Sequence, residues 1–400
     1  MRTFLRERID SNLILWKSES AKPTIFVNVS SLLVKDHGGG IQRVQRSLID
    51  NWGKNPPGEY EISPIHYSES EEKFFYVTPD NESNLKVSQH SKRGVVEMCN
   101  GDIYLNTDLD YRFALKNEAF FHSLQKNNVE AYTIIYDLLP LELPEMFPEG
   151  IYELHLKWFE TALNNSKLLC ISKTVEGNVI DWGFDKGLST VTASINLGSN
   201  LFESSTLSQQ IRAIDQPKLP INFLIVSTIE VRKSHELVLD AFEILWDEDF
   251  EVTLTFVGRR GWKVNNLLSR IKSHKNLNKK LFWFEELSDE SLEAIYKEST
   301  ALINASVGEG FGLPLVEASF FGLPLILRDI QIFREVAGED AWYFRTADPE
   351  GLALSLKSWI ENFMDGKVSP SKGIGSFSWQ DTCDQIVEII RKDKAIGGKN

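Results

Sequence analysis

Apolar residues follow two different spacings along the chain, and their alternation predicts an α/β protein. Short apolar runs of strand length are separated by longer segments in which apolar residues recur every three or four positions, as in an amphipathic helix. In the first half, the candidate strands are 24–30, the run around Phe75, 102–106, 132–137, 167–172 and 190–194. Strands that alternate with helices are typical of a parallel sheet covered on both faces.

The second half alternates more regularly. Its candidate strands are the runs NFLIVS, VTLTFVG, LFWFE, ALINAS, LPLILR and AWYF, which occur between residues 222 and 344. Helical patterns lie between them, so this half is expected to form a Rossmann-like domain.

A polar stretch over 204–220, with Pro217 and Pro220, separates the two halves and is the expected linker. The length of 400 residues also favours two domains. We therefore expect an N-terminal domain over 1–205, a C-terminal domain over 206–376 and a final helical segment over 377–400, capped by Ser378.

Charge and cysteine usage limit the class of partner and compartment. The formal net charge of −14 argues against nucleic acid, because phosphate binding needs a basic surface. We expect no secretory signal, because residues 1–20 carry scattered charges, and no apolar run reaches the ~18 residues that span a membrane. The three cysteines, Cys99, Cys170 and Cys383, are far apart and lack metal-ligand spacing. These features predict a cytoplasmic protein with free thiols.

The first 22 residues are basic and place Leu5, Ile9, Leu13 and Trp16 at helical spacing. Three interpretations stay open: a helix on a membrane surface, a helix packed on its own domain, or a linker from a longer polypeptide. The first would make the protein peripheral at the inner face of the cell membrane.

The run SVGEGFGLPLVEASFFGLP, residues 306–324, carries the strongest chemical signal. It puts Glu309 before a Gly-x-Gly loop and Glu317 one turn into the helix that follows. Glycine lets the loop backbone approach a ligand, and N–H groups at a helix start bind hydroxyls or phosphate oxygens. A carboxylate can accept hydrogen bonds from a ribose diol. The loop residues expected to contact such a ligand are Gly310, Phe311, Gly312 and Leu313.

Residues 309–325 resemble the hallmark of glycosyltransferase family 4, in which seven residues separate two glutamates. The resemblance implies the GT-B fold, with two Rossmann-like domains facing a central cleft and a C-terminal helix that returns to the first domain. It also implies a retaining glycosyltransferase in which Glu309 meets the donor sugar and Glu317 meets the ribose.

Arg232 and Lys233 lie between a candidate strand and a helix, where two cations can neutralise a diphosphate leaving group. The alternative is a pair of solvated surface bases. The surrounding pattern is similar to the family's diphosphate-binding segment, and Lys233 matches it best. The chain has Ser227 and Thr228 where the family often has glycine and arginine.

The run HGGGIQRVQRSL, residues 37–48, joins the first strand to the first helix. Gly39 and Gly40 can hold an anion at the helix N-terminus. A similar GGIxRV run occurs in family members that build bacterial surface polysaccharides, and this loop meets the donor phosphates in the family. Arg43 either faces the cleft or is a solvated helix residue.

Several other residues follow candidate strands. Asp137 either orients an acceptor hydroxyl or caps the turn after its strand. Asp108 and Ser172 are weaker candidates for the acceptor side. By resemblance to the family's VGxxGW pattern, Gly258 and Arg259 are expected near the base or the phosphates.

No metal or cofactor is expected. The chain lacks clustered His and Cys ligands. The Asp-x-Asp spellings at 108–110 and 247–249 are short enough to arise by chance in an acidic chain. A Gly-x-Gly-x-x-Gly motif is also missing after the early strands, which disfavours a nicotinamide enzyme.

The expected activity is transfer of a hexose or deoxyhexose, mannose or rhamnose favoured, to a growing glycan or lipid-linked acceptor in bacterial O-antigen or capsule synthesis. The expected donors are GDP-mannose, dTDP-rhamnose or a UDP-sugar, with no metal requirement. Two alternatives stay open: a GT-B sugar-nucleotide epimerase, and an inactive nucleotide-sugar-binding partner in a polysaccharide-synthesis complex. Peripheral membrane or multi-enzyme association also stays open.

Overall fold

The computed structural model describes residues 13–18, 20–34, 39–79, 85–87, 94–198, 219–371, 374 and 377–397. The chain divides into two compact units. Unit 1 contains residues 1–141, 150–198 and 377–400, and unit 2 contains residues 142–149 and 199–376. The expected boundary at 205/206 and most of the expected linker lie outside the described residues.

The segment Glu142–Glu149, which the sequence analysis assigns to the N-terminal domain, belongs to unit 2. Contacts with the start of a later helix explain this. Trp262 Nε1 donates to the Met146 carbonyl at 3.1 Å, and Lys263 Nζ donates to the Glu145 carbonyl at 2.7 Å. The rings of Phe147 and Trp262 lie 5.8 Å apart. Trp262 thus packs at a helix start, but against a segment distant in sequence.

Unit 1 is built on an eight-stranded sheet with the order β10-β9-β8-β7-β2-β3-β4-β5. Its strands are β2 (Thr24–Asn28), β3 (Glu61–Ser68), β4 (Lys73–Pro79), β5 (Leu85–Val87), β7 (Ile103–Asn106), β8 (Glu130–Ile135), β9 (Lys167–Cys170) and β10 (Thr192–Ser194). The strands from β10 to β3 are parallel, while β4 and β5 are antiparallel to their neighbours.

The antiparallel edge corrects the expectation of a purely parallel sheet around Phe75. Only residues 69–72 join β3 to β4, and a crossover to a parallel strand needs a dozen residues or more. The sequence analysis did not identify β3 as a strand. Pro64 lies inside it, and proline normally argues against a strand because it cannot donate to a ladder.

The N-terminal segment also differs from its helical expectation where the structure describes it. Leu15–Trp16 forms β1, which pairs in parallel with β6, Glu97–Met98. The Leu15 amide donates to the Val96 carbonyl at 2.8 Å, which adds to this pairing. Ile14, the residue before this strand, lies in the core and is 3% exposed. Leu5 and Ile9 lie outside the described residues.

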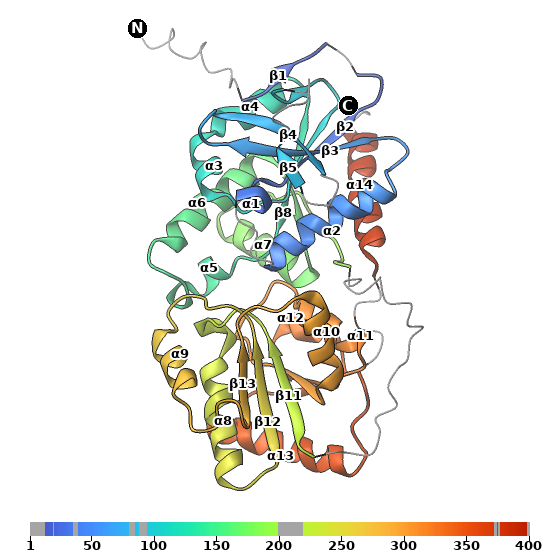
Figure 1. Ribbon diagram of the computed structural model, residues 1–400. Coiled ribbons are helices and arrows are strands. Elements are labelled where there is room, and N and C mark those ends of the chain that lie inside the picture. The colour runs from blue at the N-terminus through green and yellow to red at the C-terminus, as the bar shows by residue number, and fades with distance from the viewer. Residues whose placement is uncertain are drawn as a thin grey trace. The chain divides into compact units, whose positions relative to one another are not determined.

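Helices cover the sheet of unit 1. They are α1 (Ser30–Val34), α2 (Gly40–Lys54), α3 (Tyr111–Lys116), α4 (Glu118–Lys126), α5 (Leu139–Glu142), α6 (Ile151–Asn165), α7 (Lys173–Asp185) and α14 (Trp379–Gly397). The last helix of the chain, α14, packs against α2, the first long helix (Figure 1). Tyr132 donates to Asp393 at 3.0 Å, and the Asn196 amide donates to Gln385 at 2.9 Å. These bonds hold α14 on unit 1.

Unit 2 contains a fully parallel sheet with the order β13-β12-β11-β14-β15-β16. Its strands are β11 (Ile221–Val226), β12 (Val252–Val257), β13 (Leu281–Phe284), β14 (Ala301–Asn304), β15 (Leu325–Arg328) and β16 (Trp342–Phe344). Its helices are α8 (His235–Asp247), α9 (Asn265–Lys272), α10 (Asp289–Glu298), α11 (Leu313–Phe320), α12 (Gln331–Ala337) and α13 (Pro349–Met364).

Alternation along β11 shows how the two faces of this sheet are buried. Phe223 and Ile225 belong to one apolar cluster, which includes residues of α8, α9 and α13. Leu224 belongs to a second cluster, which includes residues of α10, α11 and α12. Successive side chains of a strand point to opposite faces, so the unit has a helix–sheet–helix architecture.

The three cysteines are free and buried. Burial raises the pKa of Cys170 to about 12, so its thiol stays protonated at neutral pH. Within the ranges that the structure describes, no helix combines the length and apolar character needed to cross a membrane.

Candidate functional site

Two loops meet at the carboxyl edge of the unit 2 sheet. One follows β11 and contains a short 3₁₀ turn, Val231–Lys233; the other connects β14 to α11. Because β11 and β14 are parallel neighbours, their following loops leave the sheet at the same edge. The Val307 amide donates to the Arg232 carbonyl at 2.9 Å, which joins the two loops directly.

Glu309 lies at the centre of an ion cluster formed by these loops. Its carboxylate accepts from Arg232 Nη1 at 3.1 Å and forms an ion pair with Lys233. Ser306 Oγ adds a hydrogen bond at 2.6 Å. The side chains of Glu309, Lys233 and Arg232 are only 10%, 13% and 14% exposed, so these residues are not solvated surface charges.

A second carboxylate completes the cluster. Glu230 is 3% exposed and pairs with Arg232 Nη2 at 2.8 Å. Arg232 also donates to the Gly308 carbonyl at 2.9 Å, so its guanidinium contacts both loops. Two cations and two carboxylates give a formal charge of zero, which makes burial of the group tolerable.

The cluster holds Glu309 in its charged form. Burial by itself would raise the pKa of Glu309, but Lys233, Arg232 and the Ser306 hydroxyl outweigh it and hold that pKa at about 2. Burial and the neighbouring Arg232 lower the pKa of Lys233 from its usual value, while Glu309 opposes this change. The arrangement therefore presents preorganised charge in a largely water-excluded place.

A neutral histidine lies beside the cations. His235, the first residue of α8, is 1% exposed, and its Nε2 lies 3.2 Å from Ser227 Oγ. Burial, followed by the charge of Lys233, lowers the pKa of His235 to about 3. The imidazole is therefore uncharged at neutral pH and adds no third cation to the cluster.

The loop after β12 approaches the loop after β11 closely. A side chain at Gly258 would place its Cβ 2.0 Å from the Ser227 carbonyl oxygen, and the backbone there has φ +152°. Only glycine fits at this contact. Arg259 is half-buried and pairs with Glu286 at 3.2 Å. Gly258 thus shapes the same strand edge at which the ion cluster lies.

The Gly-x-Gly loop leads into α11 as the sequence pattern indicates. Gly312 is the N-cap residue with φ +111°, a conformation that favours glycine. Gly310 and Leu313 are buried and Phe311 is half-buried. Glu317, one turn into the helix, is 1% exposed and accepts from Tyr296 Oη at 2.6 Å.

The acidic residues at the strand ends of unit 1 are bonded to backbone amides. Asp108 is 1% exposed and accepts from the Ser31 amide at 2.6 Å. Burial raises the pKa of Asp108 to about 6, although the bonds from Ser31 lower it. Asp110 caps α3 by accepting from the Arg112 and Phe113 amides at 2.9 and 3.0 Å. The first Asp-x-Asp spelling therefore serves local structure.

Asp137, a half-buried residue, follows β8 and accepts from the Leu139 amide at 3.1 Å, the turn-capping interaction that was one of its two expected roles. His155 and Tyr111 lie nearby: Tyr111 Oη is 3.0 Å from His155 Nδ1. Burial and the charge of Asp137 raise the pKa of Tyr111. Burial lowers the pKa of His155, while Asp137 opposes this change.

The remaining unit 1 candidates lie at two helix starts. Ser172 caps α7, where its hydroxyl accepts from the Val175 amide at 3.1 Å. Gly39 is the N-cap residue of α2 and Gly40 its first residue, and both are exposed. Arg43 is half-buried on α2. His37 and Gly38 of the same run lie outside the described residues.

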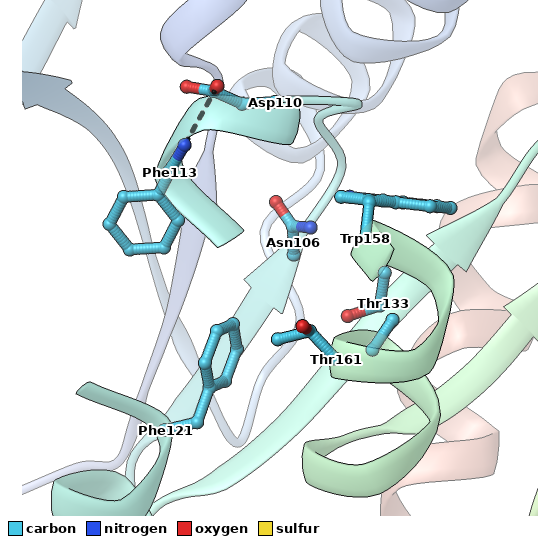
Figure 2. Close-up of a pocket in the computed structure, with 8 residues that line it drawn as sticks. Asn106, Asp110, Phe113, Phe121, Thr133, Trp158 and Thr161 are labelled. Carbon is cyan, nitrogen blue, oxygen red and sulfur yellow. Dashed lines mark hydrogen bonds between the residues drawn. The ribbon is translucent and has the colours of Figure 1, made fainter. Parts of the chain in front are cut away.

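Two hollows in the described part of the chain lie away from the ion cluster. One, of about 10 Å³, is lined in unit 1 by Asn106, Asp110, Thr133 and Trp158, among other residues (Figure 2). This volume holds about one water molecule and no sugar. Another, of about 340 Å³, lies at the amino edge of the unit 2 sheet, beside Ile221 and Val252. We therefore locate the candidate site from the ion cluster and the two loops that carry it, and not from a cavity.

Four residues of the site were not identified from sequence. Glu230 and Ser306 contact Arg232 and Glu309, and each stands within three positions of a residue that the motifs identified. His235 lies only two positions beyond Lys233. Tyr296 stands 21 positions before Glu317, so spacing alone could not connect them. Across the described residues, no three His, Cys, Asp or Glu side chains gather as metal ligands would.

Comparison with known proteins agrees with this geometry. The family profile "Glycosyl transferases group 1" matches residues 208–366. The chain is 33% identical over 379 residues to the serotype-specific mannosyltransferase WbdA of Escherichia coli, across 92% of this chain and 46% of WbdA. It is 21% identical to the O-antigen chain mannosyltransferase B of E. coli, across 70% of this chain and 74% of that protein. The chain thus spans about half the length of WbdA.

Solved structures show the same fold at low identity. Anabaena Alr3699/HepE, in complex with UDP and glucose, aligns with TM-score 0.61 and 12% identity over 92% of this chain and 100% of that one. Sucrose-phosphate synthase from Thermosynechococcus elongatus aligns with TM-score 0.65 and 14% identity over 94% of this chain and 100% of that one. The fold is therefore GT-B, and residues 208–366 match the family domain of the group 1 glycosyl transferases.

Proposed function

We propose that this chain transfers a mannosyl residue from a nucleotide-sugar, with GDP-mannose as the first candidate, to a growing or lipid-linked glycan in polysaccharide synthesis. The buried cluster of Arg232, Lys233 and Glu309 carries the proposal, because it places two cations at the carboxyl edge of a Rossmann-like sheet. The sugar is taken from the relatives, which are named as mannosyltransferases.

In the proposed reaction, the bond between the anomeric carbon and the diphosphate breaks while the acceptor oxygen bonds to that carbon. Arg232 and Lys233 stabilise the negative charge that develops on the departing diphosphate. The acceptor proton passes to an oxygen of the leaving phosphate, so no strong protein base is required. The new bond forms with retention of anomeric configuration.

Glu309 has two tasks in this proposal. In the free protein it holds both cations in place through bonds of its two carboxylate oxygens. With donor bound, it accepts a hydrogen bond from the sugar and favours the positive charge that develops on the ring. A carboxylate whose pKa is about 2 is ionised at every physiological pH, as both tasks require.

We propose that the reaction requires no metal ion. Two protein cations supply the charge that a divalent ion would bring to a diphosphate. We assign acceptor recognition to unit 1, where Asp137 is the candidate for orienting a hydroxyl. Asp108 and Ser172 support that region by holding the starts of α1 and α7.

Thermal unfolding in the presence of each of a panel of nucleotide-sugars tests which donor the protein binds. At ~100 times its dissociation constant a ligand adds about 2.7 kcal/mol to the free energy of unfolding. GDP-mannose should give the largest rise in Tm, compared with dTDP-rhamnose and UDP-sugars. The stabilising donor is then supplied with a glycan acceptor, with and without EDTA, and the product anomer is read by NMR.

The outcomes separate the alternatives. An α-linked product from an α-linked donor, formed in EDTA, supports the whole proposal. Change of the donor sugar without any acceptor would identify an epimerase. Donor binding without turnover would identify an inactive binding partner, and an inverted anomer or full inhibition by EDTA would refute the proposed mechanism.

A further inference from the structure

A tyrosine on one helix and a glutamate on the next form a buried polar pair in unit 2. Tyr296, on α10, is fully buried, and Glu317, on α11, is 1% exposed. Tyr296 Oη donates to Glu317 Oε2 at 2.6 Å. This is the distance expected of a hydroxyl that donates to a charged carboxylate.

The tyrosine ring is held rigidly. It stacks on Phe321 with the ring centroids 5.3 Å apart and the planes inclined by 14°. Leu302 and Leu315 belong to the apolar cluster that surrounds it. A ring fixed in this way gives its hydroxyl one direction, so the hydrogen bond also fixes the rotation of the Glu317 carboxylate.

The pair is oriented toward the Gly-x-Gly loop. Side chains of a helix tilt toward its N-terminus. Glu317 lies one turn from the N-terminal end of α11, so its carboxylate extends back toward the loop that carries Glu309 and Gly312. An apolar pair would fill the same space in the core without the cost of burying a carboxylate. The acid and its hydroxyl partner therefore indicate a binding role.

We propose that Tyr296 is a positioning residue, which fixes the Glu317 carboxylate so that it accepts hydrogen bonds from the ribose diol of the nucleotide donor. This inference rests on the proposed function. Tyr296 does not touch the donor; it sets the direction of the oxygen that does. The consequence is selectivity for a ribonucleotide over its 2′-deoxy form.

The test compares binding of GDP and 2′-deoxy-GDP, by calorimetry, to the unmodified chain and four variants. Tyr296→Phe removes only the hydroxyl and should lower the preference for GDP about 3- to 10-fold, the worth of one hydrogen bond. The kcat at saturating donor should change little. Glu317→Gln should lower the preference at least as much, and adding Tyr296→Phe to it should lower it no further, because the tyrosine acts through the glutamate.

Tyr343→Phe is the matched control, since Tyr343 belongs to the same unit and donates to the Gly338 carbonyl at 2.7 Å. It should leave the GDP preference unchanged. If Tyr296→Phe does not fold, Phe321→Leu replaces it: this change loosens the Tyr296 ring but keeps its hydroxyl, and should lower the same preference.

Failure of the inference differs from failure of the proposed function. If the unmodified chain prefers GDP and Tyr296→Phe keeps that preference while losing stability, Tyr296 is structural only and the inference is wrong. Additive losses in the double variant also overturn it. If the unmodified chain binds no nucleoside diphosphate, the proposed function fails, and the inference fails with it.

Discussion

The two units of this chain have acidic residues at the same kind of place, the carboxyl ends of parallel strands, but use them differently. In unit 1, Asp108, Asp110 and Asp137 accept from backbone amides at the starts of the nearby helices α1, α3 and α5. In unit 2, Glu230 and Glu309 pair with cations of the loop after β11. A carboxylate bonded to these amides holds a helix start in place, whereas one bonded to buried cations can prepare charge for a ligand.

The pKa values express the same contrast. Burial raises the pKa of Asp108 to about 6, because the amides and hydroxyls around it do not outweigh the loss of water. Burial acts in the same direction on Glu309, yet two cations hold the pKa of that carboxyl at about 2. The partners of a buried acid therefore decide its charge.

The largest effect should come from Glu309→Gln. If Glu309 stabilises charge on the sugar ring, kcat should fall ~10²–10³-fold, as when one preorganised electrostatic group is lost. Affinity for free nucleoside diphosphate should stay nearly unchanged, because the loss of a competing carboxylate charge and the loss of its hold on Arg232 and Lys233 act in opposite directions. Donor-saturation kinetics give both values, with thermal unfolding as the control for loss of fold. An unchanged kcat would place Glu309 among the structural acids, as in unit 1.

Glu317→Gln should affect binding rather than turnover. Loss of charge-assisted hydrogen bonds to the ribose should raise the donor KM by about 1.5–3 kcal/mol in free energy, with little change in kcat. Free nucleotide should bind more weakly as well. The reverse pattern in the two glutamate variants would mean that the donor lies in the opposite direction along the loop.

If Lys233 meets the phosphates before and during bond cleavage, as proposed, Lys233→Ala should weaken both binding and turnover. The loss in kcat/KM should be at least roughly tenfold, about 1.4 kcal/mol. Binding of the free diphosphate, measured by calorimetry, should fall too. A variant that binds the diphosphate as tightly as the parent would show that the phosphates lie elsewhere.

The smallest effect is a pH dependence in unit 1. Because the folded pKa of Asp108 is raised, folded protein binds more protons than unfolded protein between pH 3.8 and about 6. The contribution to stability is full below pH 3.8 and is lost as pH rises through 6, by about 1 kcal/mol per pH unit. Urea titrations at several pH values measure the free energy of unfolding of the parent and of Asp108→Asn. As pH rises from 3.8 to about 6, the parent should lose stability relative to the variant.

The same urea titrations, comparing the parent with Glu309→Gln, should show the opposite dependence of stability on pH. The folded pKa of Glu309 is lowered, so its contribution to stability is present above pH 4.5 and is lost as pH falls toward 2. Equal slopes for the two acids would remove the distinction between the units.

Much of the fold follows from local pattern. The two-domain α/β fold was predicted correctly because strands such as β11 and β12 alternate with helices at regular spacing. The strand β3 was missed because Pro64 contradicts its local pattern, and tertiary pairing with β2 overrides that preference. The pairing of β1 with β6 was missed for a related reason: its partner lies about 80 residues away.

The candidate site was likewise predictable from the sequence only in part. Motif spacing identified Arg232, Lys233 and Glu309, and the structure brings these three together. Spacing could not show that Tyr296 reaches Glu317, because that contact depends on how α10 and α11 pack. The pair of Glu230 with Arg232 is local, but it depends on the turn that the loop adopts. Spacing also could not separate Asp137 as a turn cap from Asp137 as a ligand, since either role suits an acid after a strand.

The ion cluster has a consequence for how quickly the site empties. Arg232 and Lys233 already hold a carboxylate in the free protein, so any anion that approaches them competes with Glu309. When such an anion leaves, the carboxylate takes back both cations and no counter-ion has to be recruited from solvent. Glu309 is thus a tethered competitor, present at high effective concentration, and it favours the departure of whatever the two cations have bound.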